Sequence, residues 1–87
     1  MFIMGKAVFR LEILDDSFEN DLNIIDMNER IQCEAIEESV LLHYILSCKE
    51  KLTEKTPYFV RVVRIATDEL AIVVRFIIEG EKVIFNP

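Results

Sequence analysis

Glycine, proline, histidine and tryptophan are scarce in this chain of 87 residues, which has two glycines, two prolines, one histidine and no tryptophan. No glycine lies between Gly5 and Gly80, so the chain has no glycine-rich loop of the kind that cradles phosphate groups. The same gap excludes the twelve-residue calcium loop, which needs a central glycine. The backbone features of common nucleotide-binding and calcium-binding proteins are therefore missing.

Cysteine is also rare, and two cysteines are too few for a disulfide framework. Cys33 and Cys48 lie on one predicted helix, about 22 Å apart along its axis, which excludes a bond between them. With His43 as the only histidine, three ligands cannot converge on zinc. We expect two small buried thiols, no metal site and no other cofactor.

Long apolar runs are missing as well. No stretch approaches the roughly 18 apolar residues that span a membrane, and Met1-Phe2-Ile3-Met4 is too short for a secretory signal. We therefore expect a cytoplasmic protein with reduced thiols. Its abundant isoleucine and single glutamine are a tendency shared by thermophile proteins.

Basic charge is in deficit, and the net charge is −6. A negative protein is a poor partner for nucleic acid or for an anionic membrane, both of which attract positive surfaces. Residues 15–38 carry nine acidic side chains and only one basic one, Arg30. We interpret this acidic segment as solvated, with a hard cation or a basic partner as the alternatives.

Apolar residues are plentiful, at 52% of the chain. Residues 58–66 and 70–78 contain only three polar side chains, and all three are arginines: Arg61, Arg64 and Arg75. A strand that faces water on one side should alternate apolar with polar residues, and these two barely do. Both faces of these strands are apolar and should be buried, but so short a chain has few other residues to pack over them.

The pattern predicts a single α+β domain over residues 1–87, with one long helix packed across an antiparallel sheet of four to five strands in two layers. The element order is β-(β)-α-β-β-β. Asn28 is the expected N-cap of the helix. The predicted elements are a strand at 6–14, a short strand or a loop within 18–27, the helix at 28–54, a hairpin of 58–66 with 70–78, and a last strand at 82–86.

The register of the predicted hairpin depends on its loop. A three-residue loop places Ala66 opposite Leu70, and Arg61 then lies opposite Arg75. A two-residue loop would instead bring Arg64 near Arg75. We favour the first register because it leaves one face nearly dry for the helix. Like charges directly opposite repel, so that arginine pair would need an anion or a carboxylate nearby.

We expect a non-enzymatic interaction or assembly domain without catalytic residues, because no nucleophile or general base sits in a recognisable motif. The surplus apolar surface predicts a homo-oligomer, a dimer, and leaves room for another protein partner. The expected interface residues are Phe59, Val63, Val73 and Ile77 on the outer sheet face, with His43 and Tyr44 on the helix.

Two other functions remain open. The first is a regulator that binds an anionic ligand or an acidic partner through Arg61, Arg64 and Arg75, since guanidinium groups suit carboxylate and phosphate. The simpler interpretation is that these arginines cover apolar surface and pair with Glu12, Glu79 or the acidic segment. The second is an enzyme whose site forms at a subunit interface from His43 and carboxylates.

Overall fold

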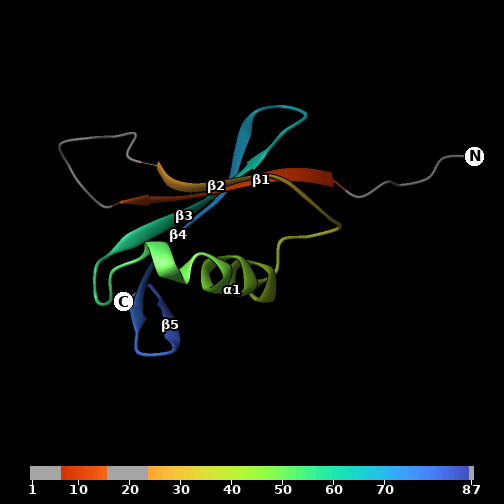
Figure 1. Cartoon of the computed structure of the whole chain (residues 1–87). Helices are drawn as coiled ribbons and strands as arrows, with labels where there is room; N and C mark the ends of the chain where they lie inside the picture. The colour runs from red at the N-terminus through yellow and green to blue at the C-terminus, as the bar shows by residue number, and fades with distance from the viewer. Residues whose placement is uncertain (1–6, 16–23, 87) are drawn as a thin grey trace, which may run out of the picture.

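The computed structural model describes residues 7–15 and 24–86, which form one helix packed against a five-stranded antiparallel sheet (Figure 1). The elements are β1 (Ala7–Asp15), β2 (Ile24–Cys33), α1 (Glu38–Ser47), a short 3₁₀ helix (Lys49–Lys51), β3 (Tyr58–Arg64), β4 (Glu69–Glu79) and β5 (Lys82–Phe85). The strand order across the sheet is β2-β1-β3-β4-β5. The prediction of an α+β two-layer fold with this order of elements is confirmed.

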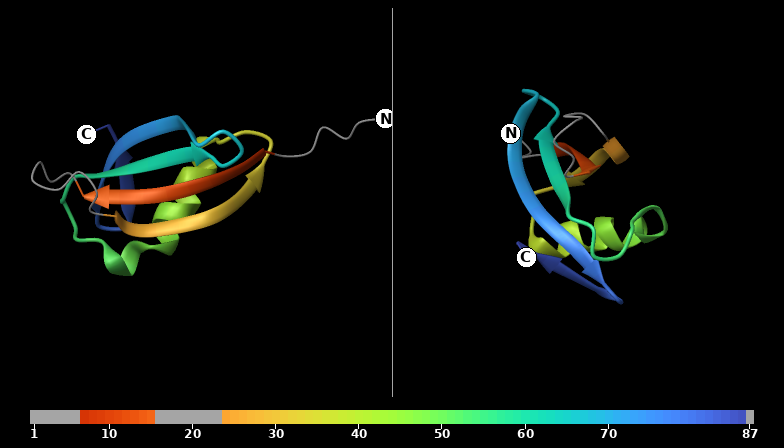
Figure 2. Two further views of the ribbon diagram at one scale, coloured as in Figure 1. Left: turned by 90° about the horizontal axis from the view of Figure 1, so that it is seen from above. Right: turned by 90° about the vertical axis from the view of Figure 1, so that its left-hand side faces the viewer.

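Strand β1 contributes several side chains to the hydrophobic core. Phe9, Leu11 and Ile13 alternate along it and are buried under the helix, as their spacing of two residues predicts. The strand pairs with β2 on one side and with β3 on the other, both antiparallel (Figure 2). Its backbone groups are therefore satisfied on both edges.

Strand β2 corrects the prediction of a helix over residues 28–54. The first part of that range continues a strand, because pairing with β1 satisfies one whole edge of β1, and such tertiary pairing overrides local helix preference. Asn28 is not a helix cap. Its side chain accepts a hydrogen bond from the backbone N–H of Arg30 (3.3 Å) where the β1–β2 register shifts. This local bond two residues ahead resembles a capping bond, which explains the misassignment. Of the segment 18–27, the part before Ile24 lies outside the described residues.

Helix α1 is therefore much shorter than predicted. Its buried residues, Leu41, Tyr44 and Ile45, continue through Cys48 at the C-cap to form one stripe at helical spacing. Leu46 on another side of the helix is among the exposed large apolar residues. The apolar side chains of the helix are thus only partly buried.

The β3–β4 hairpin has a different register from the predicted one. Arg61 lies opposite Val73, and Arg75 lies opposite Phe59, so the predicted Arg61–Arg75 pair does not form. The shift is by two residues, which leaves most side chains on their predicted faces. A bulge near the turn changes this, because Val62 pairs with Ile72 whereas Val63 pairs with Leu70.

The bulge makes Ala71 an extra residue in β4. Leu70 consequently joins Val63 on the side of the sheet turned away from α1, which we call the outer face. The prediction had placed Leu70 on the helix side. The other end of β4 is regular and closes into the predicted turn with β5, where Gly80 has a φ of 64°.

Candidate interaction surface

The half of β4 that follows the β3–β4 turn is the most exposed apolar part of the described sheet. Leu70 is 56% exposed and Val73 is 47% exposed. Ala71 is exposed as well, and Ile72 is half-buried on the helix side. In Figure 1 this end of the hairpin projects away from α1, so the helix does not reach it. These residues form an apolar surface that nothing in the described chain covers.

The same half of β4 also lacks a strand on one side. Strand β5 pairs only with Phe76–Glu79, and no other described strand lies on that side of β4 (Figure 2). Asn86, just after β5, has a φ of 51°, which ends the extended conformation. We call residues 69–74 of β4, on this side, the free edge. Its residues between Glu69 and Arg75 carry no charge and no proline, which are the usual protections of an edge strand.

A buried carboxylate lies at the centre of the outer face. Glu12 on β1 is only 2% exposed, and it accepts hydrogen bonds from Nε of Arg61 (2.6 Å) and Nε of Arg10 (3.2 Å). Arg10 also lies 3.7 Å from Asp68 in the β3–β4 turn. The two guanidinium groups close over the carboxylate, so this polar cluster is largely neutralised within the chain.

The predicted trio of arginines is not brought together. Arg61 is engaged by Glu12, as described above. Arg64 lies over the ring of Phe9, 5.3 Å from its centroid, and therefore on the helix side of the sheet. Arg75 is on the outer face, across from Phe59. The three side chains thus occupy two faces of the sheet.

The predicted interface residues on the sheet differ in exposure. Val73 is exposed, and Phe59 and Ile77 are half-buried on the outer face. Val63 is buried on that face, where it lies between Arg10 on β1 and Leu70 on β4. The exposed part of the predicted interface is therefore concentrated at the turn end of β4.

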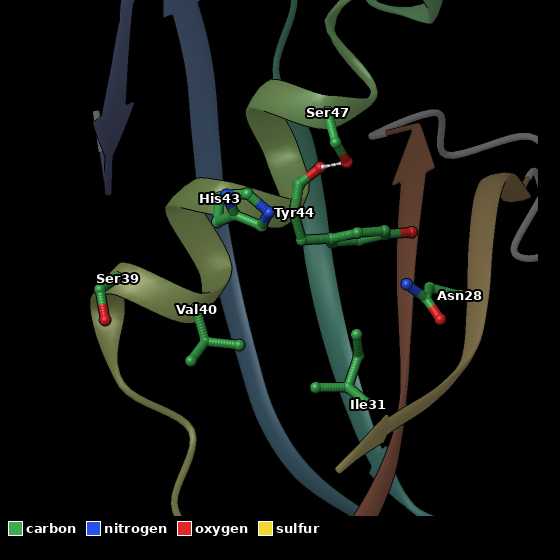
Figure 3. Close-up of a pocket in the computed structure, with 7 residues that line it drawn as sticks. All are labelled: Asn28, Ile31, Ser39, Val40, His43, Tyr44 and Ser47. Carbon is green, nitrogen blue, oxygen red and sulfur yellow. Dashed lines mark hydrogen bonds between the residues drawn. The ribbon is translucent and has the colours of Figure 1, made fainter. Parts of the chain in front are cut away.

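The two predicted helix residues lie in different surroundings. His43 is exposed and lines a groove of about 410 Å³ between α1 and β2 (Figure 3). Ile31 and Val40 supply its apolar walls, and the residues that line it include no carboxylate. Tyr44 also lines this groove but is buried, so it offers little surface to a partner.

The hydroxyl of Tyr44 belongs to a polar cluster that sequence reasoning missed. It donates a hydrogen bond to Asp26 on β2 (2.7 Å), whose other carboxylate oxygen accepts one from Lys51. The spacing of Tyr44, Cys48 and Lys51 along the chain was the available signal, since it places them on one face of a helix. Asp26 could not be linked to them while residue 28 was thought to begin the helix.

The pKa values in this cluster follow from burial and hydrogen bonding. Burial alone would raise the pKa of Asp26, but hydrogen bonds from Lys51, Tyr44 and Cys48 outweigh it and hold that pKa below its ordinary value of 3.8. Burial, reinforced by the carboxylate of Asp26, raises the pKa of Tyr44 and of Cys48. Tyr44 and Cys48 are therefore held protonated, and the cluster joins the helix end to β2 rather than providing a nucleophile.

Both cysteines are free thiols, with Cys33 at the end of β2 and Cys48 at the end of α1. They do not share a helix, so the argument from axial distance does not apply. Among the described residues, no three His, Cys, Asp or Glu side chains are grouped as metal ligands. Residues 16–23 of the acidic segment, for which a cation was one alternative, lie outside the described residues. The helices within residues 7–15 and 24–86 are too short to cross a membrane.

Comparison with protein-family models, with curated proteins and with solved structures finds no match to this chain. The function must therefore be argued from the surface itself.

Proposed function

We propose that this chain is a small non-enzymatic assembly domain that forms a homodimer through the exposed apolar surface of the β3–β4 hairpin. One observation carries the proposal: Leu70 and Val73 are about half exposed in a strand segment without a single charged residue between Glu69 and Arg75. Exposed apolar area costs about 25 cal/mol per Å² relative to buried area, so covering this segment stabilises an assembly.

A second copy is the simplest partner for such a surface. Closed dimers with two-fold symmetry are the commonest assemblies of soluble proteins, and they bury the same patch of both copies at once. A dimer through the hairpin would leave the core of each copy unchanged, because Phe76 and Ile78 at the other end of β4 are already buried.

The two alternative functions have less support. An anion bound between the arginines of the outer face would compete with Glu12, which already receives hydrogen bonds from Arg10 and Arg61. A catalytic role for His43 would need a carboxylate partner, and the groove beside it offers asparagine, serine and aliphatic side chains instead.

Sedimentation velocity over a range of protein concentrations tests the proposal. We expect a dimer at micromolar concentration that dissociates on dilution. A monomer throughout the micromolar range would contradict it. Leu46→Ser is the matched control, because Leu46 is an exposed apolar residue on the helix and its replacement should leave the dimer intact.

A further inference from the structure

Strand β2 is the other edge of the sheet, and no strand within residues 7–15 and 24–86 pairs with its side away from β1. Gln32 presents its backbone to this open edge of β2. Its partner Val8 directs its carbonyl the other way, to the N–H of Ile65 just after β3 (3.0 Å). Opposite residues in an antiparallel pair point their backbone groups either toward each other or both away. The N–H and C=O of Gln32 therefore point outward, where a further strand can pair.

Two hollows border β2 on the helix side of the sheet. The first is the groove of about 410 Å³ described above, with Ile31 and Val40 as its apolar walls (Figure 3). The second has a volume of about 370 Å³, and it is lined by Val40 together with Cys33, Glu34, Ala35 and Glu37. Ile31 and Cys33 flank Gln32 in the chain, and both pack against the core on the helix side. The two hollows therefore follow each other along β2.

The second hollow is acidic, and its charges are not neutralised by the described chain. Glu34 and Glu37 are exposed, and neither side chain forms an ion pair or a hydrogen bond with another described residue. No lysine or arginine lines either hollow. Arg64 is on the same side of the sheet, but it belongs to β3, and β1 lies between β3 and β2. A cation from a partner would complement these carboxylates.

We propose that this site binds an extended segment of another protein that carries a lysine or arginine two residues before a leucine, isoleucine or valine. The segment pairs antiparallel with the open edge of β2, and its middle residue exchanges both backbone hydrogen bonds with Gln32. The residues before and after the middle one then lie opposite Cys33 and Ile31, with both side chains on the helix side. The earlier side chain meets Glu34 and Glu37, and the later one enters the apolar groove. This inference does not rest on the proposed dimer, which uses the β3–β4 hairpin instead.

The charges favour another protein over the hairpin of a second copy. The free edge of β4, residues 69–74, contains no lysine or arginine and so does not fit the acidic hollow. The whole chain carries a net charge of −6, so two copies repel each other at long range, whereas a basic segment is attracted. Once the segment is bound, the carboxylates at one end of the site fix its direction.

The first test uses three fluorescein-labelled peptides of equal length in a background of serine and threonine. One carries Lys-Thr-Leu at its centre, the second carries the reversed order Leu-Thr-Lys, and the third carries Glu-Thr-Leu. We expect fluorescence anisotropy to show saturable binding of the first, with dissociation constants at least about tenfold higher for the other two. Equal binding of the first two peptides would contradict the antiparallel register. No binding of any peptide up to about 1 mM would overturn the inference.

The second test reverses a charge in the acidic hollow. Glu34→Lys should weaken binding of the Lys-Thr-Leu peptide by at least about tenfold and should strengthen binding of the Glu-Thr-Leu peptide. Glu81→Lys is the matched control, because it changes the net charge equally but lies in the turn between β4 and β5. At about 0.15 M ionic strength it should alter the affinity by less than about threefold. Equal losses in both variants would show a general effect of net charge and overturn the assigned site.

The third test blocks the backbone of the open edge. Gln32→Pro removes the outward N–H without removing a hydrogen bond inside the sheet, so peptide binding should weaken about tenfold while the melting temperature changes little. Gln32→Thr keeps the N–H and should bind the peptide within about threefold of the wild type. Equal peptide affinities of the proline and threonine variants would contradict the strand pairing.

Sedimentation velocity of the same proline variant identifies the occupant. If Gln32→Pro loses a homodimer that the wild type forms, the open edge of β2 binds a second copy, and the inference is overturned. If the dimer persists while peptide binding falls, the two surfaces are separate, as we expect. A wild-type monomer that still binds the Lys-Thr-Leu peptide would contradict the proposed function alone and support this inference.

Discussion

The two halves of β4 have nearly the same composition but very different surroundings. Phe76–Glu79 pairs with β3 or β5 along its length and places Phe76 and Ile78 in the core. Residues 69–74 pair with β3 alone and extend past the helix, so that Leu70 and Val73 remain exposed. What differs between the halves is the presence of β5 and α1, not the apolar character of the strand.

This contrast shows that an apolar strand segment can belong either to the core or to an exposed surface. An apolar residue is buried only where another part of the chain packs over it. A small domain has few residues with which to bury all of its apolar side chains. The contacts that hold β4 are concentrated at one end, where Lys55 N–H also donates to the carbonyl of Ile78 (2.7 Å). The following predictions test the contrast, beginning with the largest effect.

Phe76→Ala should produce the largest loss of stability. Phe76 has no exposed area and stacks with Tyr58, with ring centroids 5.7 Å apart. Truncating such a side chain leaves a cavity and lowers the free energy of unfolding by about 3–5 kcal/mol. Thermal denaturation followed by circular dichroism should show a melting temperature at least about 12 °C lower. A fall of only a few degrees would mean that this half of β4 is no better packed than the other.

Glu12→Gln should cost less, because it removes a charge without leaving a cavity. Arg10 and Arg61 would face each other across a neutral amide. We expect a loss of about 2 kcal/mol, below the range for a fully buried pair because both guanidinium groups reach solvent. Urea denaturation measures it. Glu79→Gln is the control, since Glu79 is an exposed carboxylate on β4, and equal losses in both variants would show that Glu12 is not specially held.

Tyr44→Phe should have a smaller effect and a characteristic pH dependence. It removes the hydrogen bond to Asp26 while keeping the ring in the core, which costs about 1 kcal/mol near neutral pH. The depressed pKa of Asp26 contributes stability that is present above its ordinary pKa of 3.8 and is lost as pH falls through the lower folded value. Without the tyrosine donor the pKa of Asp26 in the folded protein rises. The Tyr44→Phe variant therefore lacks part of this contribution to stability near neutral pH.

The pH profile of the free energy of unfolding separates this from a packing defect. Below pH 4 the wild type should lose stability more steeply than Tyr44→Phe, and Asp26→Asn should lack the contribution altogether. Parallel profiles for the wild type and Tyr44→Phe would assign the whole effect to packing.

Leu70→Ser should have the smallest effect on an isolated copy. An exposed side chain at the turn end of β4 has few contacts to lose, so the stability of a dilute sample should change by less than about 0.5 kcal/mol. At high concentration the difference should grow, because dimerisation raises the melting temperature of the wild type. Scanning calorimetry at two concentrations measures both. A large loss in the dilute sample would place Leu70 in the core instead.

Much of the fold could be predicted because its signals are local. The alternation of Phe9, Leu11 and Ile13 identified β1, and Gly80 identified the last turn. Strand β2 was predicted only as an optional short strand within 18–27, because Glu29 and Arg30 favour a helix and only the long-range pairing with β1 overrides them. The predicted hairpin register was wrong because the turn takes four residues, 65–68, where two or three were expected, and because β4 carries an extra residue at Ala71.

The candidate surface could be predicted only in part. The apolar surplus of β3 and β4 was visible in the sequence, but its location depends on where β5 stops. The Asn86-Pro87 pair was the signal for that end, because asparagine favours turns and proline cannot donate to a sheet. Glu12 was among the partners considered for the arginines. The burial of its carboxylate also depends on Arg10, which the sequence pattern did not connect to Glu12.

The bulge at Ala71 makes β4 tolerant of a deletion at this one position. Deleting Ala71 would leave a regular ladder in which Ile72 still faces Val62 and Leu70 still faces Val63, so the side chains of β4 would keep their faces. Deleting a residue from the regular part of the strand would instead turn over every side chain on one side of the deletion. The hairpin can therefore lose one residue at the bulge without exchanging its apolar and polar faces.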